Sequence, residues 1–180
     1  MLQHPSEAKN SLGSARLLSL AVSKSVHRVG LSWRSLSHAL GEDRVDPHKW
    51  AVLFVGTKKT GGKPYLDKNR YRNMEGLVLL DGNWKQSKTL WWRNPWLLKA
   101  HRLVLAPSEP SHYGQLRQAP RQIWLSTLEA AAEALVLLGE PEAVHQKLVA
   151  QFDAFLARAS SRSFETPTVH DNLPAVEASR

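Results

Sequence analysis

The amino-acid sequence predicts a single α/β domain with a mostly parallel sheet and flanking helices. Its 180 residues are enough for one domain with a sizeable core and too few for two domains of ordinary size. Short runs rich in leucine and β-branched residues recur along the chain. Each run is nearly continuous in apolar character, as strands buried on both faces are. A helix-length segment between the second and third runs gives the β-α-β order of a parallel sheet.

The amino-terminal residues 1–40 carry the least regular pattern. Apolar residues at 17, 18, 20 and 22 favour a strand there, and residues 32–40 favour a short helix. Further strands are expected at residues 50–55, 76–80, 102–105 and 122–125. A crossover helix is expected over residues 84–98, which is long enough to return the chain for parallel pairing.

Two helices are expected after the last of these strands. Ser126 is placed to cap the first helix, and Glu129 completes a capping box three residues later. Gly139 ends that helix, and Pro141 starts the next one. The second helix carries apolar residues at helical spacing and is expected to pack on the core through Val144, Leu148, Phe152 and Phe155.

The α/β domain is expected to cover residues 1–159. From residue 160 onward the chain is polar, contains Pro167 and Pro174, and shows no periodicity. Residues 160–180 are therefore expected to form a disordered tail.

The charge balance favours a polyanionic partner. The chain has 24 Lys+Arg against 16 Asp+Glu, a net charge of +8 and a pI near 10.0. Basic proteins gain affinity for nucleic acid by releasing its counterions. Nucleic acid is the first candidate from composition, and a basic surface that only keeps the protein soluble is the alternative.

Several classes of site and location are excluded or disfavoured by composition. The chain has no cysteine, so disulfides, thiolate metal sites and cysteine nucleophiles are excluded. Its eight histidines lack the short spacings that place two imidazoles on one ion, so no metal site is expected. No apolar stretch is long enough to span a membrane, and the amino terminus lacks the features of a secretory signal. A soluble, cytoplasmic protein is expected.

A basic loop follows the strand expected at residues 50–55. Residues 56–63 superficially resemble a phosphate-binding loop, but Gly62 precedes the lysine and Pro64 follows it, which breaks the pattern. The loop would instead contact an RNA backbone or remain a solvated charge run. The lysines expected to contact substrate are Lys58, Lys59 and Lys63.

Asp81 follows the buried strand expected at residues 76–80. Open α/β sheets bind ligands at the carboxyl ends of their strands, so Asp81 would lie at the rim of a pocket. The alternative is that Asp81 or Asn83 caps the following helix.

A second polar loop, residues 108–117, follows the strand expected at 102–105. Capping alone accounts for the run from Leu125 to Ala130.

Taken together and in order, these segments resemble the DTW-domain family. The resemblance covers about residues 2 to 138, and no single motif is very specific. The motifs that carry it are His4-Pro5 with Glu7, Ser14-Ala15-Arg16-Leu17, Asp81 with Trp84, Asn94-Pro95, Ser111 and Tyr113 with Leu116-Arg117, and Leu125 to Ala130. Two features depart from the family pattern: the cysteine-rich segment that usually precedes the His-Pro motif is absent, and Asn83 stands where the family has threonine.

The resemblance implies a SPOUT-like fold with a trefoil-knotted cofactor pocket. It also implies S-adenosylmethionine as donor, RNA as partner, most often tRNA, and transfer of the 3-amino-3-carboxypropyl group to N3 of a uridine with release of 5′-methylthioadenosine. No metal takes part in such a transfer. A carboxylate that accepts the N3 proton would act as general base, and Asp81 is the expected one.

The same resemblance suggests roles for further side chains. Ser14, Leu105, Leu125 and Thr127 would line the cofactor pocket, and Ser126 and Glu129 would shape the helix start beneath it. Trp84 would wall the cofactor or stack on the target base, or else lie in the core. Tyr113 and Arg117 would face the RNA or the carboxylate of the cofactor, and Arg93 would contact the RNA.

Two alternative functions are compatible with the sequence. One is a protein of the same fold that binds RNA or a ribosomal partner without catalysis, and the other is a SPOUT-type RNA methyltransferase. The sequence does not identify the RNA, the modified position or the oligomeric state.

Overall fold

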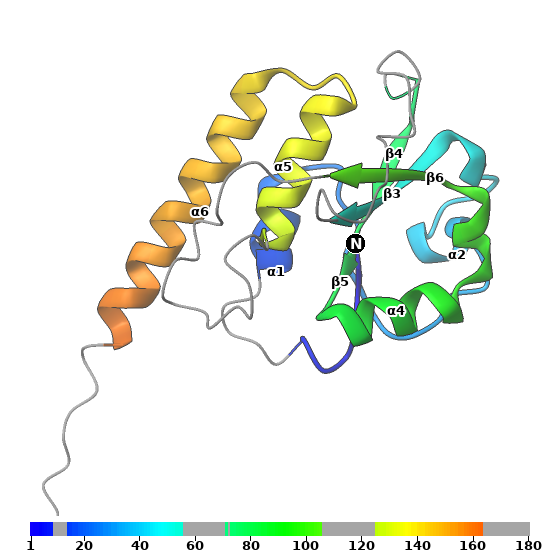
Figure 1. Ribbon diagram of the computed structural model, residues 1–180, viewed down its shortest axis with the longest axis horizontal. Coiled ribbons are helices and arrows are strands. Elements are labelled where there is room, and N and C mark those ends of the chain that lie inside the picture. The colour runs from blue at the N-terminus through cyan, green and yellow to red at the C-terminus, as the bar shows by residue number, and fades with distance from the viewer. Residues whose placement is uncertain (9–13, 56–70, 72, 106–124, 164–180) are drawn as a thin grey trace, which may run out of the picture.

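The computed structural model describes residues 1–8, 14–55, 71, 73–105 and 125–163, and it has the expected α/β architecture (Figure 1). The strands form two three-stranded sheets, ordered β2-β1-β5 and β4-β3-β6, in which every pairing is parallel. The strands are β1 (Leu2–Gln3), β2 (Arg28–Val29), β3 (Trp50–Val55), β4 (Gly76–Val78), β5 (Leu80–Asp81) and β6 (His101–Leu105).

A single extended segment joins the two sheets. Leu79 alone separates β4 from β5, and its carbonyl oxygen accepts a hydrogen bond from the amide of Leu2 at 2.9 Å. Side chains alternate between the two faces along this segment, since Leu79 lies in one core cluster and Val78 lies in the other. The carboxyl ends of β1, β5, β3 and β6 therefore meet at one edge of a nearly continuous parallel sheet.

Helices cover both faces of the sheet (Figure 1). One core cluster includes residues of α1, α5 and α6, and the other includes residues of α2 and partly buried Trp91 of α4. β3 contributes alternately to both clusters, with Ala51 and Leu53 on the first and Val52 on the second. The helices are α1 (Ser14–Ala21), α2 (Leu36–Leu40), α4 (Trp84–Arg93), α5 (Thr127–Leu137) and α6 (Glu142–Ser163), with 3₁₀ turns η1 (Pro47–Lys49) and η3 (Pro95–Lys99).

The strand expected at residues 17–22 is wrong, because these residues belong to α1 and its flank. The buried positions Ser14, Ala15 and Leu18 repeat at helical spacing, while Leu20 is 77% exposed. On a strand, Leu18 and Leu20 would share one face, so the leucine-rich composition hid the helical period. Two two-residue strands, β1 and β2, were not expected because so short a segment carries no periodicity.

Later elements agree with the sequence more closely. The expected strands at 50–55 and 102–105 are confirmed as β3 and β6. The crossover helix is interrupted at Asn94, where α4 ends and the 3₁₀ turn η3 begins at Pro95. Of the strand expected at residues 122–125, residues 122–124 lie outside the described residues, and Leu125 is not in a strand.

The end of α4 is fixed by one fully buried side chain. The Asn94 oxygen Oδ1 accepts from the amide of Trp33 at 2.8 Å. Its nitrogen Nδ2 donates to the carbonyl oxygens of Leu31 at 3.0 Å and Leu90 at 2.7 Å. Asn94 thus satisfies buried backbone groups in two separate segments and ties the helix to residues 31–33.

The two carboxyl-terminal helices pack as expected. Gly139, with φ of 107°, follows the end of α5, and its amide donates to the carbonyl of Val136 at 3.0 Å. α6 buries Leu148 and Phe152 against the core, and Val144 and Phe155 are partly buried there. The helix continues through Ser163, so the boundary expected at residue 160 falls inside it. None of the described helices is long and apolar enough to cross a lipid bilayer.

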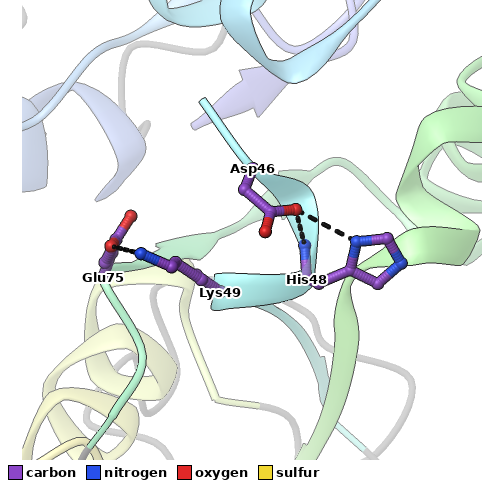
Figure 2. Close-up of polar contacts among 4 residues, drawn as sticks. All are labelled: Asp46, His48, Lys49 and Glu75. Atoms are coloured by element: carbon purple, nitrogen blue, oxygen red, sulfur yellow. Dashed lines mark hydrogen bonds and ion pairs between the residues drawn. The ribbon is translucent and has the colours of Figure 1, made fainter. Parts of the chain in front are cut away.

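Polar contacts organise the opposite, amino-terminal edge of β3 and β4 (Figure 2). Asp46 Oδ1 accepts from the backbone amide of His48 and from its ring Nδ1, both at 3.0 Å. Lys49 Nζ lies 2.7 Å from Glu75 Oε1, and the Glu75 amide donates to the Lys49 carbonyl at 2.7 Å. Both ion-pairing side chains are more than half exposed, so the pair aligns the two strand starts more than it stabilises the fold.

Candidate active site

The candidate site lies where the central parallel strands end. Gln3 is the last residue of β1, Asp81 is the last residue of β5, and the two are direct partners in the sheet register. Both side chains are buried. The expected position of Asp81 at the end of a strand is therefore confirmed. Parallel α/β sheets bind their ligands at this edge.

Asp81 is held by hydrogen bonds from two separate segments. Its oxygen Oδ2 accepts from Gln3 Nε2 at 2.7 Å, and its oxygen Oδ1 accepts from the Thr127 hydroxyl at 2.5 Å. The residue is 8% exposed. These two hydrogen bonds orient the Asp81 carboxylate. Because a carboxylate has about four lone-pair positions, Asp81 can still accept a hydrogen bond from another donor.

A third side chain extends the network behind Gln3. The amide oxygen Oε1 of Gln3 is 3.1 Å from His27 Nε2. Since this oxygen can only accept, His27 donates from Nε2, which fixes its tautomer. Burial lowers the pKa of His27, and the negative charge of Asp81 opposes part of that shift. The neutral imidazole is therefore the form that the folded protein favours.

The start of α5 completes the site. Ser126 and Glu129 form the expected capping box: Ser126 Oγ accepts from the Glu129 amide at 3.1 Å, and Glu129 Oε2 accepts from the Ser126 amide at 2.7 Å. The box fixes Thr127 as the first residue of the helix, next to the Asp81 carboxylate. The amino-terminal end of α5 therefore lies beside the Asp81 side chain.

The other residues expected to line a cofactor pocket lie on the same face of the sheet. Ser14 is the buried first residue of α1, and Leu105 is the buried last residue of β6. Leu125 is half-buried and packs against the same core cluster as Leu105. α1 and α5 are in contact. Of these side chains, Thr127 is the one with a described hydrogen bond to Asp81.

The residues after Asp81 resolve the capping alternatives. Asn83 is the N-cap of α4, with Oδ1 accepting from the Gln86 amide at 3.0 Å and Gln86 Oε1 accepting from the Asn83 amide at 2.6 Å. Asn83, and not Asp81, therefore caps α4. The Asp81 side chain is not used for helix capping. Trp84 is 72% exposed, and this excludes the core alternative for its side chain.

The remaining expected substrate contacts are not gathered at Asp81 by the described structure. Arg93 is exposed at the far end of α4, about 14 Å along the helix from Trp84. The positions of the other expected contacts, Lys58, Lys59, Lys63, Tyr113 and Arg117, lie outside the described residues.

Sequence reasoning missed Gln3 and His27. Gln3 directly precedes the His4-Pro5 motif, and a strand pairing with Asp81 would have placed it in the site. A two-residue strand gives no such signal, and the Gln3 to Asp81 bond spans 78 positions. His27 lies next to β2 in a stretch without apolar periodicity.

Comparison with known proteins adds a family relationship to this geometry. Residues 1–160 match the profile of the DTW domain. The chain is 30% identical over 152 residues to the tRNA-uridine aminocarboxypropyltransferase 2 of Drosophila melanogaster, covering 83% of this chain and 59% of the relative. It is 26% identical over 163 residues to the Macaca fascicularis protein of that name, covering 86% and 52% respectively.

A Mus musculus protein of the same name is 30% identical over 104 residues, which cover 57% of this chain and 34% of the relative. The chain thus spans at most about three fifths of the length of these relatives. No solved structure matches it.

Proposed function

The chain belongs to the DTW-domain family, and from this membership we propose that it is a tRNA-uridine aminocarboxypropyltransferase. It would use S-adenosylmethionine to place a 3-amino-3-carboxypropyl group on N3 of a uridine in tRNA. The observation that carries the proposal is the Asp81 carboxylate, oriented at the end of a central parallel strand beside a helix start. The tRNA-modifying relatives and the net charge of +8 support an RNA substrate.

The proposed reaction is a single displacement. Uridine N3 attacks the γ-carbon of the donor's methionine portion, the carbon–sulfur bond breaks, and 5′-methylthioadenosine leaves with the bonding electrons. N3 carries a proton at neutral pH, and Asp81 accepts it as the new carbon–nitrogen bond forms. Gln3 and Thr127 hold the carboxylate in place, so little reorientation is needed during the reaction.

The surrounding residues suit a cationic donor. A sulfonium would be attracted by the Asp81 charge, and the start of α5 would attract the carboxylate of the donor's methionine portion. Ser14, Leu105, Leu125 and Thr127 would form the walls of the donor pocket. A SPOUT-like trefoil knot around this pocket is part of the proposal, and it is supported by family membership alone.

The reaction class is tested with two isotopically labelled donors. The full-length protein is incubated with unmodified tRNA and with S-adenosylmethionine labelled either in the carboxypropyl carbons or in the methyl group. We expect only the first label to enter tRNA, and nuclease digestion followed by mass spectrometry should place it on uridine N3. Transfer of the methyl label instead would identify an RNA methyltransferase.

A binding measurement separates the enzyme from a non-catalytic relative. Calorimetry with S-adenosylmethionine should show saturable binding. If the protein binds tRNA in a salt-dependent manner and shows no affinity for the donor, it is an RNA-binding protein of the same fold and the proposal is wrong.

The role of Asp81 is tested separately by Asp81→Asn. This variant keeps the shape of the side chain and removes the proton acceptor, so kcat is expected to fall about 10² to 10⁴-fold. Asp43→Asn, which changes an exposed aspartate elsewhere, is the matched control and should keep wild-type kcat. An unchanged rate for Asp81→Asn would exclude Asp81 as the base while leaving the reaction class intact.

A further inference from the structure

α4 presents an exposed face made of two tryptophans and two lysines. Trp84 is 72% exposed and Trp92 is 69% exposed. Lys85 and Lys88 are exposed between them. Residues three or four positions apart are neighbours on a helix, so Lys88 lies next to both tryptophans and to Lys85. These four residues are called the α4 face below.

The α4 face is not needed for packing the helix onto the sheet. Fully buried Leu90, on the opposite side of α4, performs that task, and partly buried Trp91 packs at the flank of the face. Trp91 also packs edge-on against Phe54 with ring centroids 5.2 Å apart, and Arg102 lies 5.0 Å from the centroid of the Trp91 ring. Two tryptophans left in solvent on the other side indicate a surface that is covered by something else.

The charged residues along the chain through α4 are of one sign. No aspartate or glutamate occurs between Asp81 and Glu109, a stretch that contains Lys85, Lys88, Arg93, Lys99 and Arg102. Within the part of the chain that the structure describes, no acidic side chain pairs with Lys85 or Lys88. The partner that this surface complements is therefore anionic and offers flat faces for tryptophan.

We propose that the α4 face binds unpaired RNA, with bases stacked on Trp84 and Trp92 and phosphates contacted by Lys85 and Lys88. Unpaired bases are the RNA groups that stack on aromatic side chains, whereas bases in a helix are not accessible for it. Trp84 follows Asp81 by three positions, so RNA on this face leads toward the candidate site. The statement that bound RNA leads toward the candidate site rests on the proposed function, whereas the binding of RNA to the α4 face does not.

A second copy of the chain is the less favourable occupant. Two α4 faces brought together would oppose Lys85 and Lys88 of one copy to the same lysines of the other. Like charges in contact oppose association unless an acidic group intervenes, and the α4 face contains none.

Binding of a fluorescein-labelled short oligouridine, followed by anisotropy, tests the proposal without any donor. Trp92→Ala should weaken binding about tenfold, which is the range for loss of one stacked base. Trp92→Phe keeps an aromatic face and should bind within about twofold of wild type. Because Trp92 is largely exposed, both variants should unfold at the wild-type temperature.

Salt dependence separates the lysines from the tryptophans. Lys88→Gln should reduce the slope of log affinity against log salt by about 0.7, as expected for one lost phosphate contact on a single strand. Trp92→Ala should leave that slope unchanged. Lys147→Gln, which removes one exposed charge from α6, is the control and should alter neither affinity nor slope.

Two results would overturn the proposal. One is wild-type affinity for oligouridine in the double variant Trp84→Ala, Trp92→Ala. The other is a dimer in sedimentation that this double variant dissociates without any change in RNA affinity, since the face would then bind a second copy. Failure of the proposed function looks different: RNA binding would depend on the α4 face while no donor carbon entered tRNA.

Discussion

Asp81 illustrates what single residues contribute to this protein. Its carboxylate is positioned by Gln3 from β1 and by Thr127 from α5, and His27 supports Gln3 from behind. Sequence could place Asp81 at a strand end, because an apolar run precedes it. The sequence does not identify the hydrogen-bond partners of Asp81. The bonds to Gln3 and Thr127 span 78 and 46 positions, and they depend on the sheet register and on where α5 begins.

His27 makes stability depend on pH. Burial lowers the pKa of His27 in the folded protein, so below about pH 6.5, the ordinary value, the unfolded chain binds the proton more readily. The contribution of His27 to the free energy of unfolding is present above that pH and is lost as pH falls through the folded-state pKa. Thermal unfolding midpoints measured between about pH 8 and pH 5 should therefore decrease on acidification.

His27→Gln provides the comparison, because glutamine keeps a hydrogen-bond donor for Gln3 and does not titrate. Its unfolding midpoint should fall less than that of the wild type over the same pH range. Equal decreases in both proteins would show that other groups cause the acid sensitivity.

At the scale of elements, prediction succeeded where a periodic pattern was long or capped. β3, α5 and α6 combine continuous apolar runs or helical spacing with clear starts and stops, and the capping box of Ser126 is confirmed. The sequence predicts a strand where the structure has α1, because four apolar residues in a short span fit either period. β1 and β2 owe their extended form to pairing with distant segments, which no local pattern reports.

Asn83 belongs to this scale, since it starts α4 where the DTW family has threonine. Both residues cap helices, and asparagine is the slightly better cap. Asn83→Thr is therefore expected to change the free energy of unfolding by no more than about 0.5 kcal/mol, whereas Asn83→Ala should lower it by about 1 kcal/mol. Urea unfolding of both variants measures the difference, and a Thr variant as unstable as the Ala variant would contradict it.

Across the whole molecule, the segment of residues 76–81 joins both sheets, and helices cover both faces. One core cluster contains Phe152 of α6, the other contains Leu36 of α2, and both side chains are fully or almost fully buried. Since β3 contributes side chains to both clusters, neither face can lose its packing without disturbing the other. The two clusters are therefore expected to unfold together in one transition.

Variants on opposite faces test this cooperativity. Phe152→Ala and Leu36→Ala should each lower the free energy of unfolding by about 3 kcal/mol, because each leaves a cavity in a packed core. Each should do so in a single transition that circular dichroism and tryptophan fluorescence report at the same urea concentration. Non-coincident transitions in either variant would show that the faces unfold separately.

The central place of β1 has a consequence for biosynthesis. β1 leaves the ribosome before its neighbours β2 and β5, yet it pairs between them, and its Gln3 meets Asp81 only after 78 further positions have been translated. The nascent chain can pair β1 with β2 early, but the other edge of that segment stays unpaired until β5 has been translated. Pairing of β1 with β5 would be a late step of folding during translation, and it is the step that assembles the candidate site.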